Sequence, residues 1–260
     1  MNIKKIAAVA ALGSLVAACG GNGDGGGGGN GGAGAPSSGS AGSSSSTTFT
    51  AATPAVGTTD VYAMATVDDS DNTINGTYTQ RVTRINTDGS YALTQVDPGN
   101  DSVVVNGVSY RFDPTTLTFD GQGRELSADA TLANGNPQDC IYTITSGGHT
   151  PPWVVGQSWT QTVQEVCAPG ANFAVTESGS VVGVEQVAVP AGTFTALKFH
   201  EIQAWTDDNG QHISTDVTHW VDPAHSLFTL KKVIVYTRSG NVPAHYATSV
   251  TIELKNRPAN

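Results

Sequence analysis

The chain has 260 residues, only 13% of them charged, and a formal net charge of −10 at pH 7. An acidic surface repels nucleic acid and anionic lipid head groups, which excludes a nucleic-acid-binding role. Few charged residues together with abundant Thr, Ser, Gly and Val favour short strands and turns over long surface helices, so we expect an all-β protein.

Residues 1–18 have the features of an export signal. Lys4 and Lys5 form a basic start, residues 6–16 are mostly apolar, and small residues precede Cys19. The apolar run is shorter than the roughly 20 residues that span a bilayer. The segment resembles a bacterial lipobox, and an ordinary secretory signal with a chance cysteine is the alternative.

The lipobox resemblance implies cleavage before Cys19 and lipidation of that residue with diacylglycerol and an acyl chain such as palmitate. The membrane would then be a partner through the lipid anchor. Because Gly20 follows, and not the Asp that causes retention, the resemblance further implies the cell envelope, at the outer membrane, as the location.

The segment 19–59 consists of the lipidated Cys and a linker rich in Gly and Ser. Such a composition buries too little apolar surface to offset the entropy of ordering, so we predict a disordered tether. Residues 60–260 form the folded part, and a subdivision near residue 150 is left open.

Strand patterns separated by hairpin signals begin near Val61. Asn106-Gly107 lies between two β-branched or aromatic runs, and Asp88-Gly89 separates another such pair. Longer strands are predicted at 180–189, 193–205, 212–221, 228–236 and 245–254. No window shows a sustained apolar stripe at helical spacing, which leaves room for a small helix or two at most. We therefore predict an antiparallel meander that forms a curved sheet, half-barrel or barrel.

Two cysteines, Cys140 and Cys167, remain after Cys19. In an oxidising compartment a single pair of thiols normally forms a disulfide. The alternative is a metal or redox site, which would need a closely spaced Cys-x-x-Cys or neighbouring ligands, and the sequence has neither.

Two motifs in the second half carry a family resemblance. Val155-Gly156-Gln157-Ser158-Trp159 is followed by Val189-Pro190-Ala191-Gly192-Thr193-Phe194, then Trp220-Val221-Asp222-Pro223 and Glu253-Leu254. This series is similar to uncharacterised bacterial envelope domains with vGxxW and VPAGTF motifs, over roughly residues 150–255. The resemblance implies a curved antiparallel sheet in the style of periplasmic lipoprotein carriers, without an established reaction.

Aromatic residues are the candidate ligand-binding side chains. In a half-barrel they could line an apolar groove that accepts a lipid or another amphiphile, whereas in a closed β-domain they would be core. The candidates are Trp153, Trp159, Phe194, Trp205 and Trp220.

Catalytic and metal-binding sites are not predicted. His212 and His219 lie an odd number of residues apart, on opposite faces of one strand, which argues against a shared metal. The acidic run 68–76 lacks the Glu that closes a calcium loop. Four carboxylates could pair across strands as the acid and nucleophile of a glycosidase do: Glu165, Glu177, Glu185 and Glu201. No sequence feature that indicates a substrate accompanies them. We expect no cofactor.

The sequence therefore predicts a lipid-anchored, non-catalytic envelope protein that binds an apolar ligand or a partner protein. Two alternatives stay open: a surface hydrolase acting on glycans or esters, and a structural or adhesive module. A groove lined with Trp and Phe favours ligand binding, whereas paired acids at hydrolase spacing favour catalysis.

Overall fold

The computed structural model describes residues 48–50, 52–96, 103–105, 108–110, 115–121, 123–131, 137–148, 151–168, 171–207, 210–225, 229–242 and 246–258. The predicted export signal, Cys19 and the tether up to residue 47 lie outside this range. Within the described residues, no helix has the length and apolarity needed to cross a membrane.

All regular structure in the described residues is strand. The elements are β1 (Thr48–Phe49), β2 (Thr59–Asp68), β3 (Thr73–Ile85), β4 (Tyr91–Val96), β5 (Val103–Val105), β6 (Val108–Tyr110), β7 (Thr115–Phe119), β8 (Glu125–Thr131), β9 (Pro137–Gly147), β10 (Trp153–Val154), β11 (Ser158–Ala168), β12 (Ala171–Val189), β13 (Gly192–Thr206), β14 (His212–Val221), β15 (Thr229–Ser239) and β16 (Ala247–Asn256).

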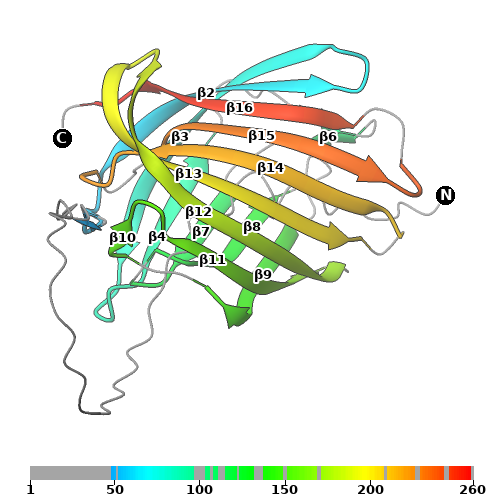
Figure 1. Cartoon of the computed structure of the whole chain (residues 1–260), viewed down its shortest axis with the longest axis horizontal. Helices are drawn as coiled ribbons and strands as arrows, with labels where there is room; N and C mark the ends of the chain where they lie inside the picture. The colour runs from blue at the N-terminus through cyan, green and yellow to red at the C-terminus, as the bar shows by residue number, and fades with distance from the viewer. Residues whose placement is uncertain are drawn as a thin grey trace, which may run out of the picture.

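Twelve of these strands form one closed barrel in the order β11-β12-β13-β14-β15-β16-β2-β3-β4-β7-β8-β9 (Figure 1). Every neighbouring pair is antiparallel, and the chain meanders around the barrel until β16 pairs with β2. The predicted all-β meander is confirmed. β9, which precedes residue 150, pairs with β11, which follows it, so both halves of the chain belong to this one sheet.

The wall of the barrel is uneven. Strands β12 and β13 have 19 and 15 residues, whereas β4 and β7 have 6 and 5 (Figure 1). Two short ribbons, β1-β10 and β5-β6, lie outside the closed sheet. In the second ribbon Val105 pairs with Val108, as expected for the predicted Asn-Gly hairpin, whose two turn residues lie outside the described range.

The β12-β13 hairpin is formed by the VPAGTF motif. Val189 pairs with Gly192, which has a φ of 136° and so adopts a backbone conformation that only glycine takes readily. Pro190 cannot donate a hydrogen bond to the ladder and ends β12. The hairpin turn predicted from these residues is confirmed.

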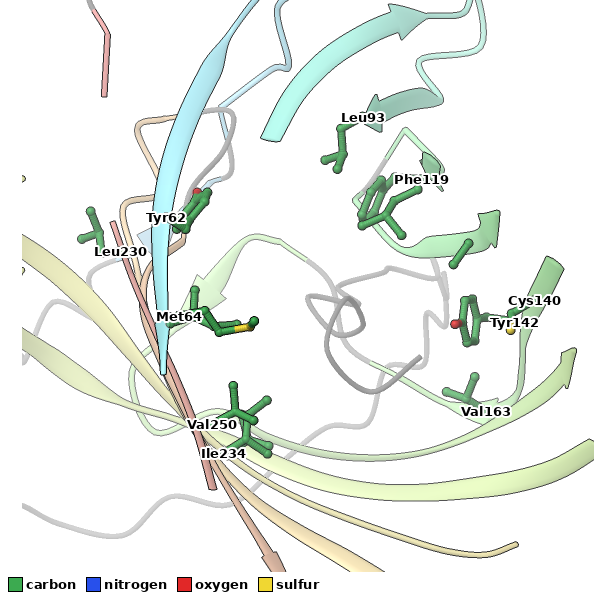
Figure 2. Close-up of a cluster of buried hydrophobic side chains, with 14 of the residues drawn as sticks. Tyr62, Met64, Leu93, Phe119, Cys140, Tyr142, Val163, Leu230, Ile234 and Val250 are labelled. Carbon is green, nitrogen blue, oxygen red and sulfur yellow. The ribbon is translucent and has the colours of Figure 1, made fainter. Parts of the chain in front are cut away.

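Side-chain alternation decides which residues face the interior. In β16, Val250, Ile252 and Leu254 are buried and the residues between them are more exposed. Because successive side chains of a strand point to opposite faces, one face of each barrel strand lines the interior. Figure 2 shows labelled side chains of opposite walls, such as Met64 and Tyr142, directed toward the centre of the barrel.

A second apolar cluster lies at the end of the barrel where β11 begins. It contains Trp153, Trp159, Val181, Leu197, Phe199 and Val221, with Phe49 of β1 packed against it. The Trp153 and Phe199 rings meet edge to face with centroids 5.5 Å apart. The β1-β10 ribbon therefore contributes its aromatic side chains to the packing at this end.

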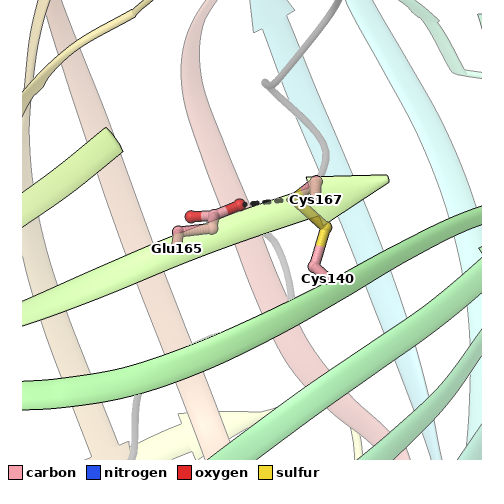
Figure 3. The surroundings of a disulfide bond; sticks show 3 residues. All are labelled: Cys140, Glu165 and Cys167. Atoms are coloured by element: carbon pink, nitrogen blue, oxygen red, sulfur yellow. Dashed lines mark hydrogen bonds between the residues drawn. A yellow bond between two sulfur atoms is a disulfide. The ribbon is translucent and has the colours of Figure 1, made fainter. Parts of the chain in front are cut away.

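The predicted disulfide is confirmed. Cys140 of β9 and Cys167 of β11 are directly opposite in the antiparallel register and are joined by a disulfide bond (Figure 3). Closing a loop of 27 residues stabilises the fold by roughly 3 kcal/mol in the chain-entropy account. The bond cross-links the β9-β11 step, where a longer connection interrupts the run of hairpins.

A buried ion-pair network lies where β2 begins and β16 ends. Asp60, which has no exposed surface, contacts the Arg257 guanidinium at 3.2 Å and His225 Nδ1 at 3.6 Å. Arg257 also donates to Asp222 Oδ2 at 2.8 Å. Burial raises the pKa of Asp60, and the Arg257 charge opposes that effect. The network ties the first and last barrel strands to the β14-β15 connection.

Candidate functional site

Four glutamates and one lysine are buried inside the barrel. They come from five strands and are between 4% and 8% exposed: Glu125 of β8, Glu165 of β11, Glu177 of β12, Glu201 of β13 and Lys232 of β15. We call them the interior acid cluster. Charged residues are almost never buried unless they are paired or have a function.

Strand alternation places the cluster in the interior. In the second half of β13 the buried positions alternate, and they are Phe199, Glu201, Gln203 and Trp205. In β15, Lys232 lies between the buried Leu230 and Ile234. The carboxylates and the ammonium group therefore occupy positions that would otherwise be apolar. Hydrophobic neighbours hold them there, away from water.

Glu177 is held by hydrogen bonds. Trp159 Nε1 donates to its Oε1 at 2.8 Å and Gln203 Nε2 donates to its Oε2 at 3.3 Å, while Thr215 Oγ1 donates to Gln203 Oε1 at 3.2 Å. Gln203 pairs in register with both Glu177 and Thr215, so strand pairing itself aligns this chain. Burial raises the pKa of Glu177, and these donors counteract part of that effect.

Unlike Glu177, Glu201 has a carboxyl oxygen without a hydrogen-bond partner. This oxygen, Oε2, is buried. Burial and the nearby charge of Glu177 raise the pKa of Glu201 well above its usual value, whereas Lys232 lowers it. Burial therefore raises the pKa of both carboxyl groups, and the pKa of Glu201, which has the charge of Glu177 beside it, lies well above its usual value.

Lys232 is the one buried cation that faces these acids among the described residues. Burial lowers its pKa, while Glu201, Glu125 and Glu177 raise it. His219 is opposite Lys232 in the β14-β15 register, and burial together with the Lys232 charge lowers the pKa of His219 well below its usual value. The imidazole is therefore neutral, with Nε2 3.1 Å from Thr229 Oγ1.

The second part of the cluster consists of Glu125 and Glu165, and Tyr142 of β9 pairs in register with Glu165. Burial raises the pKa of Glu125 to about 8, with a further increase from Glu165, and burial raises the pKa of Glu165 to about 7. Both Glu125 oxygens and the Tyr142 hydroxyl are buried without a hydrogen-bond partner. Burial, Glu125 and Glu165 all raise the pKa of Tyr142.

The disulfide borders this second part. Cys167 Sγ lies 3.3 Å from Glu165 Oε1, the contact drawn as a dashed line in Figure 3. A disulfide sulfur has no proton to donate, so this contact does not supply a hydrogen bond to Glu165 Oε1. The bond holds β9 and β11, which carry Tyr142 and Glu165, in fixed register.

A metal ion finds no ready set of ligands here. Among the described residues, the one group of three close metal-ligating side chains is Cys140, Glu165 and Cys167. Its two sulfur atoms are joined in the disulfide, and a disulfide lacks the thiolate that binds metals. The remaining carboxylates of the cluster do not form a group of three within ligand distance of one another.

The aromatic residues predicted from the sequence are spread over several places. Trp153 and Trp159 lie together in the second apolar cluster, whereas Trp205 lies in the main core and stacks on Phe173 at 6.3 Å. Phe194 is partly buried, with the Arg257 guanidinium 5.7 Å from its ring centroid. The structure therefore brings together Trp153 and Trp159, but not Trp205 or Phe194.

Trp220 belongs to a different face. It follows the inward-facing His219 in β14, and its indole donates to the exposed Glu185 at 2.6 Å. The ammonium groups of Lys198 and Lys231 lie 5.1 and 5.9 Å from its ring centroid. Trp220 thus takes part in a surface cation–π group.

The other sequence candidates have clear positions. His212 is exposed and His219 is buried, so the predicted opposite faces are confirmed. In the acidic run, the Asp68 carboxylate accepts hydrogen bonds from the Ser70 and Asn72 backbone amides, which forms a turn between β2 and β3. Of the four carboxylates considered as pairs, Glu185 is outside the barrel and the other three belong to the interior acid cluster.

Sequence reasoning missed Glu125, Tyr142 and Lys232. A usable signal was present for Lys232, because it occupies an inward position of an alternating strand between Leu230 and Ile234. For Glu125 the alternation is broken by a bulge in β8, because Thr118 pairs with Ser127 and Phe119 with Glu125, which leaves residue 126 without a partner. The inward position of Glu125 could therefore not be predicted from a period of two.

Comparison with known proteins leaves the family open. No family model matches the chain, and no curated protein matches it. Three solved structures align with it: a candidate lipoprotein of Parabacteroides distasonis (TM-score 0.43, 11% identity, 81% of this chain and 99% of that chain), a candidate exported protein with a YmcC-like fold from Bacteroides fragilis (0.40, 12%, 82% and 99%), and the hypothetical lipoprotein YmcC of Escherichia coli (0.38, 12%, 76% and 85%). With TM-scores below 0.5, these similarities assign no function to the chain.

Proposed function

We propose that this protein is a lipid-anchored, non-catalytic protein of the cell envelope whose barrel binds a small amphiphilic ligand in its interior. The observation that carries the proposal is the interior acid cluster, in which buried carboxyl oxygens, together with the Tyr142 hydroxyl, lack hydrogen-bond partners beside the apolar core. Buried polar groups without partners cost about 1–3 kcal/mol each, so a bound molecule that supplies hydrogen bonds would stabilise this arrangement.

The size of the barrel supports an interior ligand. Barrels of about 8 strands are filled by side chains or hold one small ligand, and barrels of about 16 strands leave a channel. This barrel has twelve strands. Its apolar side chains, among them Leu93, Phe119 and Val163 on one wall and Met64 and Ile234 on the other (Figure 2), suit the hydrocarbon part of an amphiphile.

Native mass spectrometry of the purified full chain tests the binding proposal. We expect a noncovalent adduct of at most a few hundred daltons that disappears when the protein is denatured, and its mass would identify the ligand. The proposal fails if the native protein carries no adduct and if extracted envelope lipids leave its melting temperature unchanged.

Anchoring in the envelope rests on the sequence around Cys19. Small residues before the cysteine match a lipobox, and Gly20 after it favours the outer membrane over retention. Incorporation of labelled palmitate into the wild-type chain, and its loss in Cys19→Ala, is the expected result. Separation of inner and outer membranes then tests the location, and a wild-type chain without label would contradict the anchor.

Hydrolysis of glycans or esters is the second candidate, because Glu177 and Glu201 are two buried carboxyl groups, and the charge of Glu177 helps to raise the pKa of Glu201. That is the pattern of a glycosidase acid and its partner. However, both oxygens of Glu177 are engaged by Trp159 and Gln203, which suits a structural role. Turnover of chromogenic glycosides or esters that is abolished by both Glu177→Gln and Glu201→Gln would replace binding by catalysis.

A further inference from the structure

Near Tyr142, the interior acid cluster contains acceptor oxygens that have no hydrogen-bond donor. Both oxygens of Glu125 and the hydroxyl of Tyr142 are buried without partners. An ionised or neutral carboxyl group and a phenol all offer acceptor oxygens. The group that satisfies several such oxygens at once is a donor with more than one proton, and an ammonium group has three.

The charge balance of the interior also favours a cation. Four carboxyl groups face one lysine, and His219 is kept neutral by burial and by Lys232. Lys232 interacts with Glu125, Glu177 and Glu201, whereas the pKa of Glu165 has burial as its cause and no contribution from Lys232. On the Glu125–Glu165 side of the cluster, the carboxyl groups can therefore carry more negative charge than Lys232 can neutralise.

The surroundings of this side fit the rest of an amphiphile. Phe119 pairs in register with Glu125 and stacks on Tyr91 with centroids 5.0 Å apart. In Figure 2, Phe119, Tyr142 and Val163 lie on the same wall of the barrel. Aromatic faces attract cations and also accommodate hydrocarbon, so a charged head and an apolar tail find suitable neighbours side by side.

We infer that Glu125, Glu165 and Tyr142 bind the protonated amino group of an amphiphilic amine inside the barrel. This inference rests on the proposed function, since it specifies the ligand of the same interior. The ammonium group donates to the two carboxylates and to the Tyr142 oxygen, and the apolar tail packs against the wall of the barrel that contains Phe119 and Val163 (Figure 2).

Proton release distinguishes this binding mode from simple hydrophobic uptake. Because burial raises the pKa of Glu125 to about 8 and of Glu165 to about 7, one or both carry a proton at pH 7. A bound ammonium group favours the ionised carboxylates and lowers both pKa values. The displaced protons pass to the buffer, and the ligand keeps its own. The other titratable groups that face the site are Lys232, whose pKa burial lowers and the acids raise, and Tyr91 and Tyr142, whose pKa values burial raises, so that both phenols stay neutral at pH 7.

The test compares three probes with the same tail by isothermal titration calorimetry on the purified full chain: octylamine, 1-octanol and octanoate. We expect octylamine to bind at least roughly tenfold more tightly than 1-octanol, as a charge-assisted hydrogen bond implies. The binding enthalpy of octylamine at pH 7 should depend on the ionisation enthalpy of the buffer, and that of 1-octanol should not.

Three variants complete the design. Glu125→Gln and Tyr142→Phe should each weaken octylamine binding and leave 1-octanol binding unchanged, which also shows that the variants are folded. Glu185→Gln, on the outer surface, should leave both unchanged. Equal binding of octylamine and 1-octanol, or tighter binding of octanoate, overturns the amine site while leaving the interior ligand in place. If none of the three probes binds, the proposed function fails as well.

Discussion

The ionisation of Glu125 provides a quantitative test of the buried acid cluster. Burial raises the pKa of this side chain from 4.5 to about 8, with Glu165 adding to the increase and Lys232 opposing it. Because the unfolded chain loses this proton at a lower pH than the folded protein, Glu125 contributes stability fully below pH 4.5. That contribution is lost as the pH rises to about 8.

The size of the stability loss follows from the size of the shift in the pKa of Glu125. Each pH unit in this window costs about 1.4 kcal/mol, so the contribution lost between pH 5 and pH 8 is about 4 kcal/mol. Glu125→Gln keeps the shape of the side chain but cannot ionise, so the variant does not lose this stability as the pH rises. For a domain of this size 1 kcal/mol corresponds to about 2–4 °C, so the melting temperature of the variant relative to wild type should rise by on the order of 10 °C.

Thermal unfolding followed by circular dichroism at pH 5, 6, 7 and 8 measures this difference. Glu165, Glu177, Glu201, His219 and Lys232 titrate in both proteins, so their effects largely cancel. Glu185→Gln is the matched control: its carboxylate is exposed and its pKa is lowered by the Trp220 indole, so its difference from wild type should stay constant over this range. The reasoning is refuted if the gap between Glu125→Gln and wild type is the same at pH 5 and pH 8.

Two further substitutions test the packing of the barrel. Arg257→Ala should lower the free energy of unfolding by about 3–5 kcal/mol, because it removes the guanidinium that pairs with the fully buried Asp60. Chemical denaturation should show that adding Asp60→Asn recovers part of the loss, and equal stability of the single and double variants would contradict this. Gly179→Ala should cost about 1–3 kcal/mol in the same assay, since its new methyl group would overlap the Trp159 ring. Gly183→Ala in the same strand meets nothing within 4 Å and serves as the control; a similar loss in both variants would show that overlap with Trp159 is not the cause.

Local chemistry in the sequence was sufficient to predict the hairpins, the strand class and the disulfide. Pro190 and Gly192 allow a tight reversal, and the alternation of Val250, Ile252 and Leu254 identifies an inward face whatever the barrel size. The opposite exposure of His212 and His219 follows from the same period of two. These features depend on neighbours within a few residues, which is why a single sequence reveals them.

The sequence did not determine where the acids converge. Glu125, Glu165, Glu177 and Glu201 lie on four strands that the barrel brings around one interior, and strand register rather than sequence spacing aligns Glu177 with Gln203 and Thr215. Closure through β16 and β2 turns one face of every strand inward, and only that closure removes these carboxyl groups from water. The sequence by itself thus determined the strands and their faces, whereas the tertiary structure decided that polar residues on those faces form one buried, acid-rich centre.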